Sequence, residues 1–414
     1  MRAQVLNPAD PQHAQLVARI YRQLGHKALA ITAYEDALAT PGLVPTAPFL
    51  HDLGRLYEDE KRFNEASERY LQAVAADSTY APAMKDLADL YDRAGRFDMA
   101  AGTFLRYLDL VPGDLAARLC LGDCLLELGR FDQAAAAAGI AWSEGLDDPM
   151  AGFTFATAGI RAHSDTLRDH AAEVMISLLD ESGGGYAWQT EDLLELAAWQ
   201  VDHKDHEGAR KTLTRAEGLA PEDPRIPFQL GLAELAAGRA PEAVEQCQKA
   251  AALDPAAPAN FLNLGIARYQ AGQVEESIPA FRQAAALRPD LVIARLLLAQ
   301  ALAATGSLPD AEMEYRGILE LEPRNAKALR GVGFCRLRAA DYPGAVKAYT
   351  QATEADPANA DGWAGLGNAR LGAGDLDAAE AAFAKAKAID PQNIMLRTGT
   401  QLLDQARNGG KENQ

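Results

Sequence analysis

The chain has 414 residues, of which 48% are hydrophobic and 7% aromatic, and its formal net charge is −18. This composition excludes a disordered chain, and the negative charge argues against nucleic acid or an anionic membrane surface as partner, because both attract clustered lysine and arginine. No apolar run approaches the roughly 18 residues of a membrane span, so we expect no membrane insertion.

Alanine and leucine dominate the apolar residues and β-branched runs are scarce, so we expect helices throughout. The N-terminal residues lack an apolar signal core and the four cysteines are too scattered for a disulfide framework, which together predict a cytoplasmic protein. Segment 1–11 contains "VLNPADP", which is similar to the end of a later helical unit, "ALDPAAP" at 252–258. We therefore expect the chain to begin in the middle of such a unit, either because sequence upstream of Met1 is missing or because 1–11 is a short lead-in.

Residues 12–145 contain four units of about 34 residues in which small and aromatic residues recur at fixed positions. The marker residues of the first three units are Ala18, Tyr21, Gly25, Ala30 and Tyr34, then Gly54, Tyr57, Ala66 and Tyr70, then Ala88, Tyr91, Gly95, Ala100 and Phe104. Gly122, Gly129 and Ala134 mark the fourth unit. We therefore expect an N-terminal repeat block over 12–145.

The repeat pattern is interrupted over 146–185. Ala141 and Ala216 are 75 residues apart, seven more than two periods of 34 residues. Residues 149–181 have a helical pattern without the marker residues, and 183–185 form the only triple glycine in the chain. We expect a degenerate helical hairpin and a flexible glycine-rich turn that separates two repeat blocks. The alternative is an ordinary loop within one continuous array.

Residues 186–391 form a second block with a stricter period. Six prolines follow one another at steps of 34 residues: Pro221, Pro255, Pro289, Pro323, Pro357 and Pro391. Proline ends a helix because it lacks an N–H group and restricts the preceding residue. In the last unit we expect helices over about 361–371 and 376–389, with Gly367 and Ala379 where they cross. Segment 392–406 is expected to form a capping helix, and the tail 407–414 to be disordered.

The last unit carries a known sequence pattern. Its markers are Trp363, Leu366, Gly367, Ala379, Phe383, Ala386 and Pro391, although Arg370 stands where tyrosine is usual. This hairpin of 34 residues resembles the tetratricopeptide repeat (TPR), whose signature is W-x2-L-G-x2-Y…A-x3-F…P. The resemblance covers nearly the whole chain. It implies an all-α, right-handed α-solenoid of about ten to eleven helix-turn-helix repeats with a C-terminal capping helix.

No group of residues in the sequence predicts catalysis or metal binding. His203 and His206 fall in a turn between two helices of one unit, without a third ligand at fixed spacing. Cys120 and Cys124 are better explained by packing of small residues than by a metal, and Cys247 takes an aromatic position of the repeat, where we expect it to be buried. We therefore expect no enzyme activity, no metal and no cofactor.

The resemblance places positions two, five, nine and twelve of each first helix on an inner groove, since these positions share one side of a helix. In the second and third units they hold charged residues, His51, Arg55, Glu58, Lys85, Asp89 and Asp92. In the seventh to tenth units they form the candidate ligand-binding groove: Phe228, Leu232, Leu262, Ile266, Tyr269, Leu296, Lys327, Arg330 and Phe334, with Arg338 adjacent. The alternative is that the apolar residues pack against neighbouring helices and the basic ones are ordinary surface.

Some TPR proteins bind a C-terminal carboxylate through a Lys/Asn clamp. Here Asn368 occupies one clamp position of the last unit, but Ala364 occupies the other. The clamp is incomplete, so the sequence does not predict this kind of binding.

Three functions are compatible with the sequence. The repeat coverage favours a non-enzymatic scaffold or adaptor that binds a peptide or helical segment of a partner protein in its concave groove. The second is a self-associating assembly protein, and thus a homo-oligomer. The third, kept open by the mid-unit start, is the regulatory part of an enzyme whose catalytic section is elsewhere. In the favoured case the partner is a protein or peptide and not a nucleic acid.

Overall fold

The computed structural model describes residues 11–146, 148–181 and 186–409. These residues form 23 helices and no strand, which confirms the predicted all-α repeat fold. The chain divides into two compact units, here called unit 1 (1–196) and unit 2 (197–414), with the division inside one helix. Residues 1–10 of the expected lead-in at 1–11, the triple glycine at 183–185 and the end of the expected tail, 410–414, lie outside the described residues.

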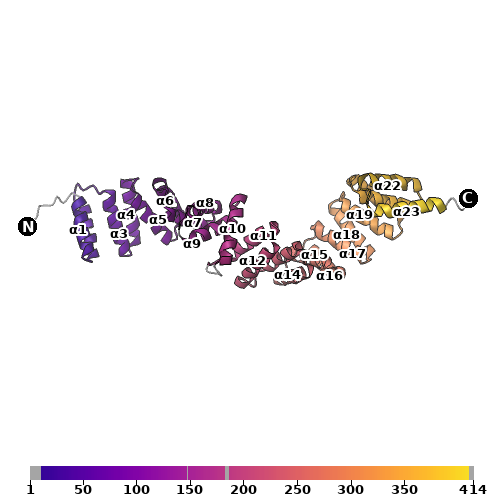
Figure 1. Cartoon of the computed structure of the whole chain (residues 1–414), viewed down its shortest axis with the longest axis horizontal. Coiled ribbons are helices and arrows are strands. Elements are labelled where there is room, and N and C mark those ends of the chain that lie inside the picture. Colours follow the sequence, from indigo (N-terminus) through magenta and orange to yellow (C-terminus); the bar gives the residue numbers. More distant parts are fainter. Residues whose placement is uncertain (1–10, 147, 182–185, 410–414) are drawn as a thin grey trace, which may run out of the picture. The chain divides into compact units, whose positions relative to one another are not determined.

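Unit 1 is built from helices that pack against their neighbours in sequence (Figure 1). The helices are α1 (Pro11–Gln23), α2 (Lys27–Leu38), α3 (Ala47–Asp59), α4 (Phe63–Ala76), α5 (Ala81–Arg93), α6 (Phe97–Leu110), α7 (Leu115–Glu127), α8 (Phe131–Ser143), α9 (Pro149–Ile160) and α10 (Asp165–Glu181), and the division falls in α11 (Thr190–Asp202). Helices α9 and α10 occupy the segment without marker residues, and α9 packs on both α7 and α8. The segment therefore continues the packing of helices although its sequence departs from the repeat.

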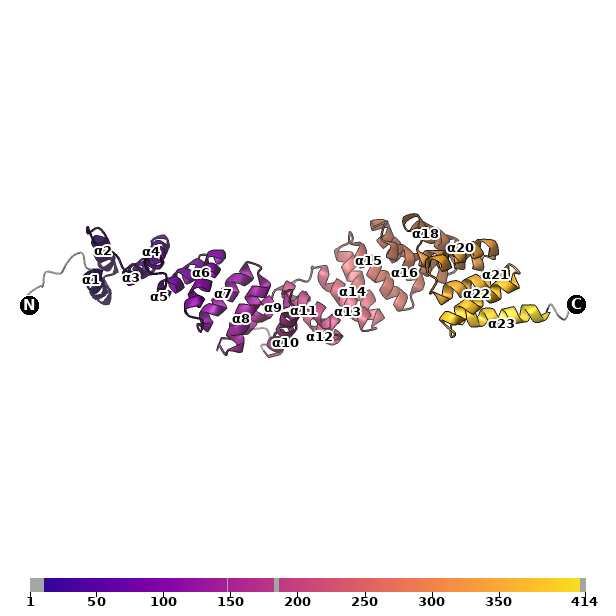
Figure 2. The ribbon, with the colours of Figure 1, turned by 90° about the horizontal axis from the view of Figure 1, so that it is seen from above.

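In the part of unit 2 that the structure describes, α12 is followed by five hairpins, from α13 with α14 to α21 with α22, and Figure 2 shows these paired helices from above. The helices are α12 (His206–Leu219), α13 (Arg225–Ala236), α14 (Ala240–Leu253), α15 (Pro258–Gln270), α16 (Val274–Leu287), α17 (Val292–Ala304), α18 (Leu308–Leu321), α19 (Ala326–Arg338), α20 (Tyr342–Ala355), α21 (Ala360–Gly372), α22 (Leu376–Ile389) and α23 (Ile394–Gly409). Several first helices also contact the first helix of the next hairpin: α13 contacts α15, α17 contacts α19, and α19 contacts α21. First helices of successive hairpins therefore lie side by side from α17 to α21.

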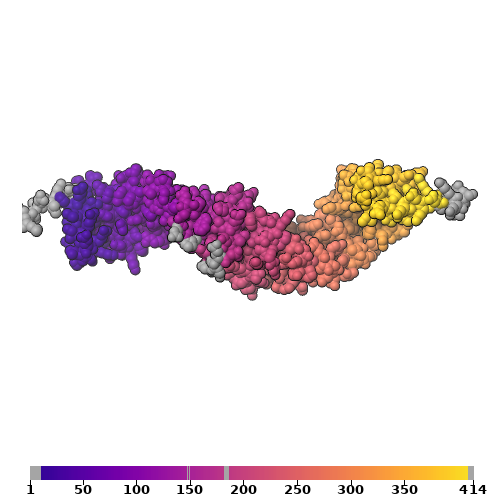
Figure 3. All heavy atoms as spheres, viewed as in Figure 1, coloured from indigo at the N-terminus to yellow at the C-terminus, as the bar shows by residue number. Residues whose placement is uncertain are grey.

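Small residues let neighbouring helices approach closely, both within a hairpin and between successive hairpins. A side chain added at Gly367 would overlap the ring of Phe383, and one added at Gly365 would overlap the ring of Tyr349. Ala379 is fully buried where α22 crosses α21 at Gly367. The sequence prediction for this crossing is therefore confirmed: the small residues leave room for aromatic rings beneath the first helix. In the space-filling view, side chains close the spaces that the ribbon leaves between neighbouring helices of each unit (Figure 3).

The last helix, α23, packs on α21 and α22 through one face. Leu396 and Leu403 are buried on that face, whereas Ile394 and Leu402 are exposed. The helix extends to Gly409, past residue 406, where we expected it to end. Arg407 explains part of the extension, because its guanidinium donates to Asp377 on α22 at 2.7 Å.

Candidate functional site

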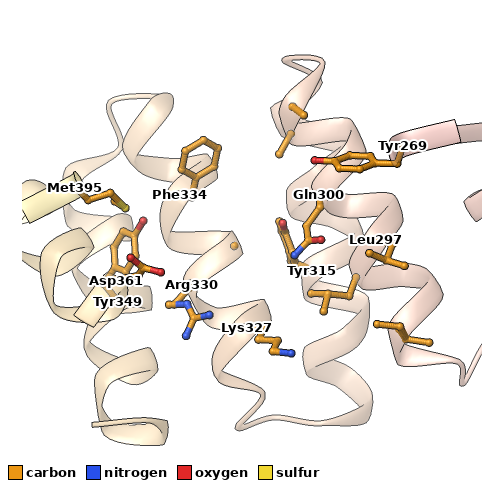
Figure 4. A pocket seen from close by; sticks show the side chains of 15 residues that line it. Tyr269, Leu297, Gln300, Tyr315, Lys327, Arg330, Phe334, Tyr349, Asp361 and Met395 are labelled. Carbon is orange, nitrogen blue, oxygen red and sulfur yellow. The ribbon is translucent and has the colours of Figure 1, made fainter. Parts of the chain in front are cut away.

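Unit 2 contains a groove of about 770 Å³ along the row of first helices (Figure 4). Its floor and walls come from α15, α17 and α19, and further side chains reach it from α18, α20, α21 and α23. The groove therefore exists because the first helices of three successive hairpins lie next to one another. All of its lining residues belong to unit 2.

Half of the predicted site residues line this groove: Tyr269, Leu296, Lys327, Arg330 and Phe334. Figure 4 shows Lys327, Arg330 and Phe334 along α19, with Tyr269 on the opposite wall. Tyr269 is 41% exposed and Phe334 is 37% exposed, whereas Leu296 is buried in the floor. The groove thus has aromatic surface toward one end of α19 and positive charge toward the other.

The other predicted residues are Phe228, Leu232, Leu262, Ile266 and Arg338, and none of them lines the groove. Leu262 and Ile266 are partly buried and pack against the apolar cluster around α17 and α18, as the packing alternative expected. Arg338 is exposed in the last turn of α19.

The two cations of the groove differ in their surroundings. Among the described residues, Lys327 is exposed and has no carboxylate within 4.0 Å. Arg330 lies 3.9 Å from Asp356, measured from Nη1 to Oδ2. Asp361 also lines the groove, and its carboxylate accepts a hydrogen bond from Asn393 at 2.7 Å. The site is therefore less basic than the sequence suggested, and Lys327 is its free charge.

Two tyrosines of the groove were not predicted as site residues. Tyr315 on α18 and Tyr349 on α20 are only 5% and 2% exposed, but both line the groove. Burial raises the pKa of Tyr315 to about 12, so its hydroxyl stays protonated and able to donate at neutral pH. The sequence places both residues in the buried aromatic column of the repeat. In the other hairpins from α13 to α22 this column holds phenylalanine or cysteine, so the hydroxyls at these two positions were the signal that could have identified them.

Charged side chains at the inner positions of unit 1 form ion pairs with residues of the next hairpin. His51 Nε2 lies 2.8 Å from Asp86 Oδ2, and Lys85 donates to Asp114 at 2.6 Å. Glu58 pairs with Arg93. These contacts join residues of successive hairpins, so the charged side chains at the inner positions there are largely engaged in the protein's own ion pairs.

The histidines and cysteines considered as metal ligands in the sequence contact neighbouring side chains of the fold. His203 stacks on Trp199 with ring centroids 4.0 Å apart, and the Cys124 thiol lies 3.3 Å from Asp92. Cys247 is buried, as predicted, and burial raises the pKa of its thiol to about 12. Across the described part of the chain, no group of three or more His, Cys, Asp or Glu side chains is arranged to hold a metal.

The described helices are each too short or too polar to cross a membrane.

Comparison with known proteins identifies repeats along most of the chain. A family model described as "Tetratricopeptide repeat" matches residues 51–114, 85–142, 197–258, 262–333 and 336–394, and a second model with the same description matches 15–40. Together these ranges cover more than half of the chain. No curated protein matches the sequence.

Solved structures with a similar arrangement of helices have low sequence identity. The structure titled "YrrB: a TPR protein with an unusual peptide-binding site" is 18% identical, with 46% of this chain and 97% of that chain covered and a TM-score of 0.41. The "APC/C hetero-tetramer Cut9-Hcn1" is 15% identical, with 96% and 90% covered and a TM-score of 0.41. "PilW, widely conserved type IV pilus biogenesis factor" is 19% identical, with 50% and 97% covered and a TM-score of 0.44.

Proposed function

Because the chain belongs to the tetratricopeptide-repeat family, we propose that it is a non-catalytic scaffold that binds a peptide or helical segment of a partner protein in the groove of unit 2. The observation that carries this proposal is the combination, in one groove, of an apolar floor with an exposed lysine that lacks a carboxylate partner among the described residues. A packed helix surface has no need of this combination, whereas a ligand with apolar and acidic groups would satisfy both parts of it.

The two parts of the groove have different roles in the proposal. Leu296, Tyr269 and Phe334 bury apolar surface of the ligand, which stabilises a complex by about 25 cal/mol per Å² removed from water. Lys327 and Arg330 orient an acidic group by charge-assisted hydrogen bonds. The chain carries a net charge of −18. An acidic segment is therefore repelled by most of the surface and attracted to these two cations.

A cytoplasmic location is part of the proposal. The four cysteines are free thiols, and three of them are buried, which suits a reducing compartment.

The test is a selection from a library of random eight-residue peptides with acetylated and amidated ends, carried out with the full chain. We expect enriched peptides to contain aspartate or glutamate together with bulky apolar residues. The variant Lys327→Glu with Arg330→Glu should bind the enriched peptides at least about tenfold more weakly, because two attractive contacts become repulsive. The difference in affinity between the parent and this variant should become smaller in about 1 M salt, where charges are screened within a few ångströms.

The matched control is Lys347→Glu with Lys387→Glu, which changes the net charge equally at two exposed positions outside the groove. This control should bind like the parent. Equal binding by the parent and the groove variant, or no enrichment by the parent over the groove variant, would show that the groove is not the binding site.

A further inference from the structure

The tyrosines of the groove differ from tyrosines at the same repeat position in unit 1. There, Tyr34 donates to Asp52 at 3.4 Å and Tyr70 donates to Glu58 at 2.7 Å. Tyr315 and Tyr349 have no hydrogen-bond partner for their hydroxyls among the described residues. One end of each ring is packed in the core while the polar end lines a groove.

The sequence explains why these hydroxyls lack a partner. The residue equivalent to Glu58 is Ala303 for Tyr315 and Leu337 for Tyr349, each twelve positions before its tyrosine. The residue equivalent to Asp52 is Gly331 for Tyr315 and Gly365 for Tyr349, each two positions before the glycine that corresponds to Gly54. Tyr315 and Tyr349 therefore have the hydroxyl of Tyr34 and Tyr70 without the carboxylate that accepts from it in unit 1. A donor left without an acceptor is costly when water is displaced, so a ligand that enters the groove has to supply acceptors.

More donors lie beside these hydroxyls. In Figure 4, Tyr349 and Tyr315 lie on opposite sides of Arg330, and Gln300 projects from α17 next to Tyr315. With Lys327, the groove presents at least five groups that donate, and one carboxylate, Asp361, that is already bonded to Asn393. The ligand must therefore be rich in acceptors.

Backbone conformation decides how many acceptors a peptide offers. In a helix the carbonyl groups are bonded within the helix, whereas an extended segment presents free carbonyl groups to its surroundings. We propose that the groove holds its ligand as an extended segment whose backbone carbonyls accept hydrogen bonds from Tyr315 and Tyr349, while an acidic side chain meets Lys327. This inference rests on the proposed function and narrows its ligand class.

The geometry of α19 sets the spacing within such a segment. Lys327 and Phe334 are seven residues apart on one helix, or about 10.5 Å along its axis. An extended chain covers that distance in about three residues. The expected ligand therefore has an aspartate or glutamate about three residues from a bulky apolar residue.

The experiment measures affinity of the enriched capped peptides for the full chain with Tyr315→Phe and Tyr349→Phe combined. Phenylalanine occupies the same repeat position at 281 and 383, so the variant should keep its fold and helicity. We expect affinity to fall about tenfold, since two hydrogen bonds are lost. The control Tyr342→Phe, a tyrosine that does not line the groove, should leave affinity unchanged. A version of the same peptide stapled into a helix should bind more weakly than the linear form.

Each outcome has a defined meaning. Unchanged affinity after both tyrosine replacements, or tighter binding by the stapled helix, would overturn the extended-segment inference. If the charge-reversal variant still lost binding in that case, the proposed function would stand without it. If the charge-reversal variant also bound normally, the proposed function itself would be wrong.

Discussion

At the scale of single residues, the positions of glycine decide how close two helices come. Gly365 lies over the Tyr349 ring, and a Cβ atom there would overlap ring carbons. Tyr349 is buried and has little room to move. The same glycine that costs helix propensity therefore permits a large aromatic ring in the core beneath it.

Gly365→Ala should lower the free energy of unfolding by about 1–3 kcal/mol, because the added methyl group overpacks the crossing of α20 and α21. Gly218→Ala is the matched control in unit 2, since its Cβ would meet nothing within 4 Å. That change should stabilise the protein by up to about 1 kcal/mol through helix propensity. Urea denaturation followed by circular dichroism measures both. If both changes had the same sign, the close packing at Gly365 would not limit stability.

At the scale of helices, one carboxylate in unit 1 connects three elements. Asp114 caps the N-terminus of α7 by accepting from the Ala117 N–H at 3.0 Å. It also accepts from Lys85 on α5 at 2.6 Å and from the Tyr107 hydroxyl on α6 at 2.8 Å. Burial opposes the charge of Asp114, but these hydrogen bonds outweigh it and hold the pKa of the carboxyl below its ordinary value.

Asp114→Ala should destabilise the protein by about 2–3 kcal/mol, because a cap and two further hydrogen bonds are lost. Asp375→Ala removes a cap on α22 that accepts from Ala378 at 3.2 Å, and it should cost only about 1 kcal/mol. Thermal unfolding of both variants gives the comparison. Equal losses would mean that Asp114 acts as a cap alone.

The pH dependence of Asp114 follows from the direction of its pKa shift. Because the folded pKa is lowered, its contribution is complete above the unfolded value of about 4 and is lost as the pH falls through the folded value. The stability difference between the parent and Asp114→Asn should therefore shrink in acid. A difference that stayed constant to low pH would contradict the assignment.

The period of the prolines and small residues was enough to predict the helices. The expected second helix of the last unit, 376–389, coincides with α22 (Leu376–Ile389), and the expected first helix differs from α21 by one residue at each end. The end of α23 could not be predicted, because the ion pair of Arg407 with Asp377 depends on a residue 30 positions away. The helices of a repeat can be predicted from local sequence, whereas side-chain contacts between residues far apart in the sequence cannot.

The site could be predicted only in part for a similar reason. Counting helix positions found Tyr269, Leu296, Lys327, Arg330 and Phe334, which line the groove. It could not separate them from Leu262 and Ile266, whose side chains turn into the core contacts of the next hairpin. It also missed Tyr315 and Tyr349, because their rings belong to the core and only their hydroxyls reach the groove.

At the scale of the whole molecule, the two units differ in how the charged residues on their first helices are paired. The chain has 58 acidic and 40 basic residues, and in unit 1 charged residues at inner positions pair with residues of the next hairpin. Lys327 has no such partner among the described residues. The central claim is that this difference makes the groove of unit 2, and not the inner face of unit 1, the place where a partner segment binds.

The most direct test replaces one phenylalanine with photoreactive benzoylphenylalanine and irradiates the full chain with an enriched capped peptide. Phe334 in the groove and Phe63 on α4 of unit 1 form a matched pair, since they are 37% and 48% exposed. We expect a peptide adduct, detected by mass spectrometry, at position 334 but not at position 63, and its loss when Lys327→Glu and Arg330→Glu are added. Equal adducts at both positions, or an adduct at position 63 alone, would contradict the account.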